Sequence, residues 1–152
     1  MTSFLLDRDV LSQLDQPENK RHVNVRKWFR TIPDNDLYMS AVTVMEGWRG
    51  KAKARKEAAG SLKKLAECDR YDADYELLLS AFEGRIIPVD EGVAKIWGQL
   101  RAEKDSHVWD LSLAAAAREN NMVIASRNLA DLVGRGARVL NPFKEPFRIV
   151  DP

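Results

Sequence analysis

The chain has 152 residues, 45% of them hydrophobic and 31% charged, with a formal net charge of +1, which predicts a single domain, residues 1–152, with a sizeable core. No run of about 18 consecutive apolar residues exists, so we expect a cytoplasmic protein with no membrane-spanning helix and no membrane partner. Because Cys68 is the only cysteine, an intrachain disulfide and a Cys-based zinc site built from this chain alone are excluded.

Short apolar segments, each followed by a polar or turn-forming residue, predict β-strands. They are Ser3 to Leu6, Leu37 to Val42, Arg85 to Val89, Met122 to Ala125 and Arg138 to Leu140. Helical patterns lie between them, and this alternation predicts an α/β fold with a central, mainly parallel sheet covered by helices on both faces. In such sheets ligands bind outside the carboxyl ends of the strands. Asp7, the loop before Glu46 and the segment from Ser126 to Asn128 would all lie there.

Two of the helical patterns are adjacent and predict a helical hairpin. A basic helix runs from about Val44 to about Ala59, and the pair Gly60 and Ser61 separates it from a second helix. The apolar face of the second helix contains Tyr71, Tyr75, Leu78 and Phe82. A later amphipathic helix has Val93, Ile96, Trp97 and Leu100 on one face. Trp97 and Trp28 are both interpreted as core residues.

The first helix of the hairpin carries most of a dense basic segment. Its cations are Arg49, Lys51, Lys53, Arg55, Lys56, Lys63 and Lys64, and Glu57 is the only acid among them. Such a segment either contacts a phosphate backbone or an acidic protein segment, or is simply a solvated helical face.

Acidic or amide side chains occur just after the predicted strands or at the start of helices. They are Asp7, Glu46, Asp110, Asn128 and Asp131. No His or Cys accompanies them in these motifs, and oxygen ligands alone suit a hard divalent cation. If the fold brings these side chains together, they form a cation-binding carboxylate cluster, and the leading hypothesis is therefore a metal-dependent nuclease.

Each of these positions also has a purely structural interpretation, as a cap at the start of a helix. The candidate caps are Asp7 or Asp9, a capping box of Thr43 with Glu46, Asp110, and Ser126 or Asn128 before a short helix over LADLV. For Glu46 the two interpretations are compatible, because a capping glutamate beside the sheet edge is held in position to reach a metal ion. The run from Ala114 to Ala117 predicts a helix that approaches the sheet closely.

Five stretches, taken together and in order, carry a family resemblance. They are FLLDRDVLSQL, DLYMSAVTVMEGWRG, FEGRIIPVDEGVAKIWGQLRA, WDLSLAAAARENNMVIASRNLADL and VLNPF. Over almost the full chain they resemble the PIN-domain proteins, specifically the VapC-like and FitB-like toxins of bacterial type II toxin-antitoxin pairs. The resemblance implies a PIN-like domain that hydrolyses RNA phosphodiesters with Mg²⁺ or Mn²⁺, forms a homodimer, and is blocked by a cognate antitoxin. Operator DNA would be a partner only through the antitoxin complex.

The resemblance also assigns roles to individual residues. Asp7, Glu46 and Asp110 become the metal-binding acids, with Glu46 either binding the metal or orienting the attacking water. Asn128 occupies the place where many relatives carry a fourth acid, and Asp131 lies in the following aspartate position; either would position a metal-bound water. The candidate substrate contacts are Arg8, Arg49, Arg127 and Trp109.

Arg8 departs from the family pattern. Relatives commonly read Asp-Thr-Asn after the first strand, whereas this chain reads Asp7-Arg8-Asp9. The cation either competes with the metal for the carboxylates or binds the scissile phosphate. It also keeps open an alternative in which the scaffold is a binding module within a DNA-binding complex with its antitoxin.

A second alternative is a phosphatase of the haloacid-dehalogenase type. FLLDRDVL fits its strand followed by Asp-x-Asp-x-Val, with Asp7 as nucleophile and Asp9 as acid/base, but IASRNLAD supplies no late acidic pair. The two histidines, His22 and His107, lie in separate polar stretches without ligand spacing, and we assign them no role.

Overall fold

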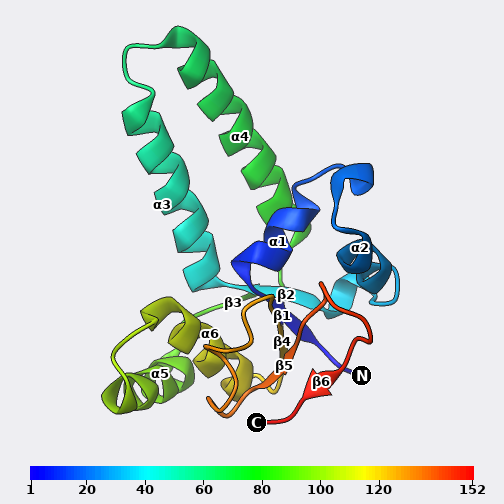
Figure 1. The fold of residues 1–152 in the computed structure, drawn as a ribbon. Coiled ribbons are helices and arrows are strands. Elements are labelled where there is room, and N and C mark those ends of the chain that lie inside the picture. Colours follow the sequence, from blue (N-terminus) through cyan, green and yellow to red (C-terminus); the bar gives the residue numbers. More distant parts are fainter.

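A computed structural model describes all residues from 1 to 152. Its centre is a six-stranded sheet with the order β3-β2-β1-β4-β5-β6, flanked by helices on both faces (Figure 1). The strands are β1 (Phe4–Leu6), β2 (Leu37–Ser40), β3 (Ile86–Ile87), β4 (Val123–Ala125), β5 (Arg138–Leu140) and β6 (Ile149–Val150). The first five pair in parallel, and β6 is antiparallel to β5. The predicted fold class is confirmed, while β6 was not predicted.

Six α-helices connect and cover these strands. They are α1 (Arg8–Leu14), α2 (Val23–Phe29), α3 (Ala41–Glu57), α4 (Leu62–Ala81), α5 (Glu91–Glu103) and α6 (Val108–Glu119). Two short 3₁₀ helices, η1 (Glu18–Lys20) and η2 (Asp34–Asp36), lie before α2 and β2. No helix is long and apolar enough to span a membrane.

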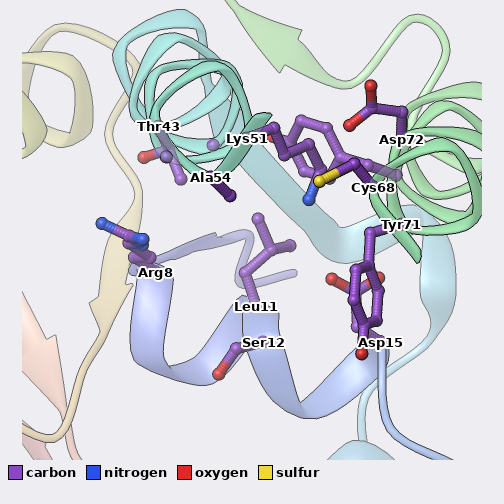
Figure 2. A pocket seen from close by; sticks show the side chains of 13 residues that line it. Arg8, Leu11, Ser12, Asp15, Thr43, Lys51, Ala54, Cys68, Tyr71 and Asp72 are labelled. Carbon is purple, nitrogen blue, oxygen red and sulfur yellow. The ribbon is translucent and has the colours of Figure 1, made fainter. Parts of the chain in front are cut away.

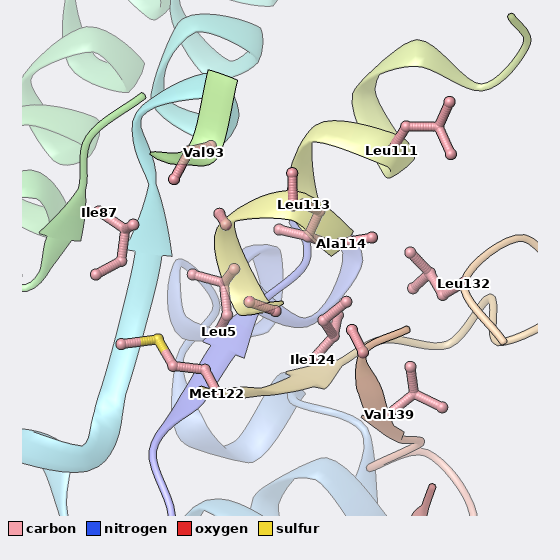
Figure 3. Packing of buried hydrophobic residues seen from close by; sticks show 14 of the residues in the cluster. Leu5, Ile87, Val93, Leu111, Leu113, Ala114, Met122, Ile124, Leu132 and Val139 are labelled. Carbon is pink, nitrogen blue, oxygen red and sulfur yellow. The ribbon is translucent and has the colours of Figure 1, made fainter. Parts of the chain in front are cut away.

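Side chains of the central strand β1 alternate between two hydrophobic clusters, one on each face of the sheet. Leu5 packs with α5 and α6 on one face (Figure 3), whereas Phe4 and Leu6 pack with α1 and α2 on the other. The alanines of α6, Ala114 to Ala117, are at most 2% exposed. The small side chains therefore let α6 lie close to the sheet, as predicted, and Trp28 is a core residue in the opposite cluster.

The helices α3 and α4 form the predicted hairpin, which projects away from the sheet (Figure 1). Gly60 has a φ of +87°, a left-handed conformation that glycine adopts without steric cost, and Ser61 caps α4 by accepting a hydrogen bond from the Lys64 backbone N–H. Arg55 of α3 donates hydrogen bonds to Asp69 and Asp72 of α4 at 2.8 and 2.7 Å. The turn and these ion pairs set the two helices side by side.

Two of the predicted helix starts are wrong. The N-cap of α3 is Ser40, whose buried hydroxyl accepts a hydrogen bond from the Thr43 backbone N–H at 3.2 Å. Because Ser40 ends β2 directly, α3 begins before Thr43, and the proposed capping box of Thr43 with Glu46 does not form. Likewise α6 begins at Val108, just after His107, so Asp110 lies in its first turn and is not its cap.

Two further capping predictions have opposite outcomes. Asp7 is the N-cap of α1, and its carboxylate accepts a hydrogen bond from the Arg8 backbone N–H at 2.7 Å. The short helix over LADLV is wrong: the Leu129 carbonyl accepts hydrogen bonds from residues 132 and 133, which makes a single turn. Gly134 follows with a φ of +79°, a left-handed conformation that does not continue an α-helix.

Candidate active site

The carboxyl edge of the three central strands β2, β1 and β4 collects the acidic side chains. Asp7 directly follows β1, Ser126 directly follows β4, and Glu46 lies on α3, which continues from β2 without a loop. The Asp7 backbone N–H donates to the Ala125 carbonyl at 3.0 Å, which extends the pairing of β1 with β4 to the edge itself. The start of α6 brings Asp110 to the same place.

Asp7 is held in a fixed orientation by a partner that the sequence did not reveal. The Ser126 hydroxyl is completely buried and donates a 2.6 Å hydrogen bond to one carboxylate oxygen of Asp7. The same hydroxyl accepts a hydrogen bond from the Asn128 backbone N–H at 3.1 Å. The sequence placed Ser126 at this edge and offered it as a helix cap, but it did not predict the hydrogen bond to Asp7, because the two residues are 119 positions apart.

The carboxylates of Glu46 and Asp110 lie within electrostatic reach of Asp7 and of each other. The pKa of Asp110 is raised by burial and further by the charges of Asp7 and Asp131, while His107 acts in the opposite direction. Burial also raises the pKa of Glu46; Arg8 opposes that rise, and Asp7 and Asp110 add to it. Partly buried carboxylates that repel one another in this way are stabilised by a bound cation.

The turn after β4 contributes Asp131 and Asn128. The side-chain amide of Asn128 donates a hydrogen bond to the Asp131 carboxylate, so the amide orients the acid, and Asn128 itself is exposed. Asp131 lies close enough to raise the pKa of Asp110. The structure therefore brings together all four acids singled out in the sequence, and Asn128 lies at their margin.

His107 also lies in this cluster, although we assigned it no role from the sequence. Its Nδ1 is 3.7 Å from a carboxylate oxygen of Asp110 and 3.8 Å from one of Asp131. One potential ligand atom from each of the three residues lies within 4.8 Å of the others. The missed signal was the spacing of three residues between His107 and Asp110, which places both side chains on the same side of a helix start.

Asp9 connects the start of α1 to the turn after β4. One carboxylate oxygen accepts a hydrogen bond from the Arg127 backbone N–H at 3.0 Å, and the other is buried without a partner. Burial raises the pKa of Asp9, and the nearby charge of Asp7 raises it further. Asp9 thus belongs to the border of the acidic cluster.

The four candidate substrate contacts differ in their surroundings. Arg8 is exposed, forms no ion pair, and lies near Gly50 of α3, while Arg49 lies close enough to Glu46 to lower its pKa. The Arg127 guanidinium lies 3.9 Å from the centre of the Phe143 ring, in a cation-π contact. Trp109 is 43% exposed beside Asp110, so its ring is available for stacking.

A cavity of about 350 Å³ separates α1 from the hairpin (Figure 2). Arg8 and Leu11 of α1 and Asp15 directly after it line one side, and Lys51 and Tyr71 line it from the two helices of the hairpin. Arg8 is thus shared between the cavity and the surroundings of Glu46, so the cavity adjoins the acidic cluster.

Comparisons with known proteins agree with this arrangement. The family model "PIN domain" matches residues 4–130. Toxin FitB of Neisseria gonorrhoeae is 29% identical over 93% of this chain and 99% of its own. A solved structure of FitAB bound to a DNA fragment has a chain 30% identical to this one, with a TM-score of 0.72 over 93% of this chain and 96% of that chain. DNA-bound VapBC from Salmonella typhimurium has a TM-score of 0.63 at 23% identity, over 91% of this chain and 97% of that one, a likeness of fold. None of these matches supports the haloacid-dehalogenase alternative.

Proposed function

The chain belongs to the PIN-domain family, and from this membership we propose that it is a metal-dependent endoribonuclease, the toxin of a type II toxin-antitoxin pair. The observation that carries the proposal is the meeting of Asp7, Glu46, Asp110 and Asp131 at one sheet edge, where burial, together with the charges of neighbouring acids, raises the pKa of Asp110 and of Glu46. A polyanionic substrate would be repelled by this edge unless a cation neutralised it. The two clusters on one sheet support treating residues 1–152 as a single PIN-like domain.

The donor set fits Mg²⁺ or Mn²⁺, because it consists mainly of carboxylate oxygens. Asp7, Glu46 and Asp110 would hold the ion. When bound, such an ion supplies charge neutralisation at the attacked phosphate and a more acidic water. Asp7 contributes a carboxylate whose orientation is already fixed by Ser126, so little ordering is needed on binding.

The remaining residues would orient water and RNA. Glu46, with its raised pKa, is suited to hold the attacking water or to share in the metal site. Asp131, oriented by the Asn128 amide, would position a second water. Arg8, Arg49 and Arg127 lie around the cluster and would contact RNA phosphates, and the exposed Trp109 ring would stack on a base.

We further propose three properties by relation to the FitB and VapC toxins. The chain works in the cytoplasm as a homodimer; a cognate antitoxin binds and blocks it; and operator DNA is contacted through the antitoxin. The solved FitAB structure is bound to a DNA fragment, which supports the last point. The cavity between α1 and the hairpin adjoins the acidic cluster and is a suitable place for an antitoxin segment.

Cleavage of a structured RNA pool by the purified chain and by an Asp110→Asn variant tests the function. Each is incubated with Mg²⁺, with Mn²⁺ or with chelator, and products are read on a gel. Asp105→Asn is the matched control, since Asp105 is an exposed acid paired with Arg101 at 2.8 Å outside the cluster. We expect metal-dependent cutting by the wild type and the control and at least about a hundredfold slower cutting by Asp110→Asn, the size of effect that loss of a group stabilising transition-state charge produces.

A chain that cuts no RNA would bear on the alternative function, in which the scaffold is a binding module within the antitoxin complex. The binding-module alternative rests on Arg8, an unpaired cation near Glu46. If the folded chain binds neither Mn²⁺ nor Mg²⁺ and cuts no RNA, the metal-dependent nuclease is rejected, and the scaffold acts through its antitoxin complex alone.

A further inference from the structure

We propose that the Nδ1 atom of His107 is a ligand of the bound metal, together with the carboxylates of Asp110 and Asp131, and that the site therefore prefers a transition-metal ion to Mg²⁺. The inference rests on the proposed metal site and goes beyond it, because it adds a nitrogen ligand to a carboxylate site and makes Asp131 a direct ligand instead of a residue that positions a water.

The distances suit a shared ion better than direct hydrogen bonds. Nδ1 lies 3.7 Å from Asp110 and 3.8 Å from Asp131, beyond the roughly 2.7–3.2 Å of an N–H···O hydrogen bond. Two ligands at about 2.0–2.2 Å from one metal ion are themselves roughly 3–3.5 Å apart. The His107 nitrogen thus stands slightly farther from each carboxylate than in a closed coordination shell, and all three ligand atoms lie within 4.8 Å of one another, so an inward movement of the side chains would complete the shell.

Local structure places His107 for this role. It has a φ of +53°, a left-handed conformation that is uncommon for a residue other than glycine, and it immediately precedes α6. Asp110 follows by three residues and lies on the same side of the helix start. Asp131, from the turn after β4, is oriented by its hydrogen bond from Asn128. The backbone conformation of His107, the start of α6 and the hydrogen bond between Asn128 and Asp131 therefore bring the three candidate ligands together.

Apart from its charge interaction with Asp110 and Asp131, the His107 side chain has no structural role. It is half exposed, makes no hydrogen bond, and does not cap α6. The other histidine differs in each respect, because the His22 Nδ1 accepts a hydrogen bond from the Asn24 backbone N–H at 3.2 Å and its ring packs on Phe143. His22 is therefore a structural residue, and His107 retains a free nitrogen beside two carboxylates.

The chemical consequence is a changed metal preference. Mg²⁺ selects oxygen ligands and retains much of its water, whereas an imidazole nitrogen favours Co²⁺, Ni²⁺ and Zn²⁺. Adding one nitrogen to a carboxylate site should therefore strengthen binding of these ions with little effect on Mg²⁺.

The experiment uses the full chain and the variants His107→Gln and His22→Gln, with thermal unfolding to verify that all three fold. Since the chain has only two histidines, the variants assign any nitrogen ligand without ambiguity. Calorimetry measures Co²⁺ and Mg²⁺ affinity, and pulsed electron paramagnetic resonance of bound Mn²⁺ detects a directly coordinated ¹⁴N. We expect His107→Gln to lose the nitrogen signal and about tenfold or more of Co²⁺ affinity, with Mg²⁺ affinity changed less than about threefold. His22→Gln should match the wild type.

Several outcomes would overturn the proposal. They are the absence of a nitrogen signal in the wild type, its persistence in His107→Gln, or an equal loss of Co²⁺ and Mg²⁺ affinity in that variant, which would indicate a structural role. If Mg²⁺ binds normally without any nitrogen signal, only the histidine ligand is rejected. If no divalent ion binds, the proposed metal-dependent nuclease is rejected with it.

Discussion

Arg8 brings a permanent positive charge close to the acidic cluster. It lowers the pKa of Glu46, has no ion-pair partner, and remains exposed at the end of the cavity. A guanidinium in this position competes with a divalent ion for the same carboxylates. The effect of Arg8 on metal binding can be measured in the absence of RNA, and so separately from any contact between Arg8 and RNA.

We expect Arg8→Thr to bind Mg²⁺ up to about fivefold more tightly than the wild type, because an exposed charge interaction contributes at most about 1 kcal/mol. Calorimetry measures the affinity. Arg148→Thr is the control, since Arg148 is exposed near the C-terminus, before β6, and forms no ion pair. Unchanged or weaker Mg²⁺ binding by Arg8→Thr would show that Arg8 does not compete for the site.

Repulsion within the acidic cluster makes the metal-free protein sensitive to pH. Burial and the neighbouring charges raise the pKa of Asp110 above its ordinary 3.8, so folding favours its protonated form. The associated stability is fully present below 3.8 and is lost as the pH rises through the folded-state pKa. Asp110→Asn removes this dependence on pH.

With chelator at pH 7.5, we expect Asp110→Asn to unfold about 3 °C higher than the wild type, roughly the shift that 1 kcal/mol produces in a chain of this size. The difference should shrink as the pH is lowered toward 4. Added Mg²⁺ should raise the Tm of the wild type more than that of the variant. A variant less stable than the wild type at pH 7.5 would mean that Asp110 makes a net favourable contribution without metal.

The presence of strands and helices was predicted more accurately than the residues at which the helices begin. The short apolar segments identified β1 to β5 correctly, because burial on both faces of a parallel sheet leaves a strong sequence signal. The start of α3 was wrong because the predicted strand ran to Val42, whereas β2 ends at Ser40, which caps the helix. The strand β6 was missed because it is a short, exposed edge strand.

The candidate site shows a similar division. Asp7, Glu46 and Asp110 each lie in a recognisable local sequence context, and the family resemblance identified them as one set of metal-binding acids. Ser126 does not, because its contact with Asp7 is made only in the fold, and for His107 the spacing to Asp110 is local but the contact with Asp131 is not. Tertiary partners of a site residue leave no periodic pattern in one sequence.

Helix packing within the hairpin depends on a glycine. A Cβ atom built at Gly47 of α3 would overlap the ring of Tyr75, a buried residue of α4. At Gly98 of α5, by contrast, nothing lies within 4 Å of such an atom. The two positions therefore form a matched pair in which the same substitution has opposite consequences.

Gly98→Ala should raise the Tm by about 2–4 °C, because alanine is roughly 1 kcal/mol better than glycine inside a helix. Gly47→Ala should lower the Tm, since displacing Tyr75 costs about 1–3 kcal/mol and outweighs the same gain. Thermal unfolding by circular dichroism measures both. A Gly47→Ala variant as stable as Gly98→Ala would show that the hairpin can open without cost.

At the scale of the whole molecule, the net charge of +1 conceals a separation of charge. The acids of the candidate site lie at the sheet edge, whereas α3 and the start of α4, in the hairpin that projects from the sheet (Figure 1), carry the basic segment; farther along α4 the charges are mainly acidic, from Glu67, Asp69, Asp72, Asp74 and Glu76. Part of that segment is used internally: Arg55 pairs with Asp69 and Asp72, and Lys51 lies 4.5 Å from the centre of the Tyr75 ring. Both interpretations of the segment, as a phosphate contact and as a solvated face, therefore concern only the cations that these internal contacts leave free.

Lys56, Lys63 and Lys64 near the hairpin turn are exposed and form no ion pair, so they remain available to RNA phosphates. Replacing all three with glutamine in the Asp110→Asn background should weaken RNA binding and reduce the slope of log affinity against log salt by about 2, since each phosphate contact contributes about 0.7 on a single strand. Fluorescence anisotropy across a salt series measures this slope. Glutamine at the exposed Lys20, Lys95 and Lys104 gives the same change in net charge away from the hairpin and should leave the slope nearly unchanged. Equal slopes for the two triple variants would mean that the hairpin attracts RNA only through overall charge, and its basic face would then be available to an acidic segment of a protein partner.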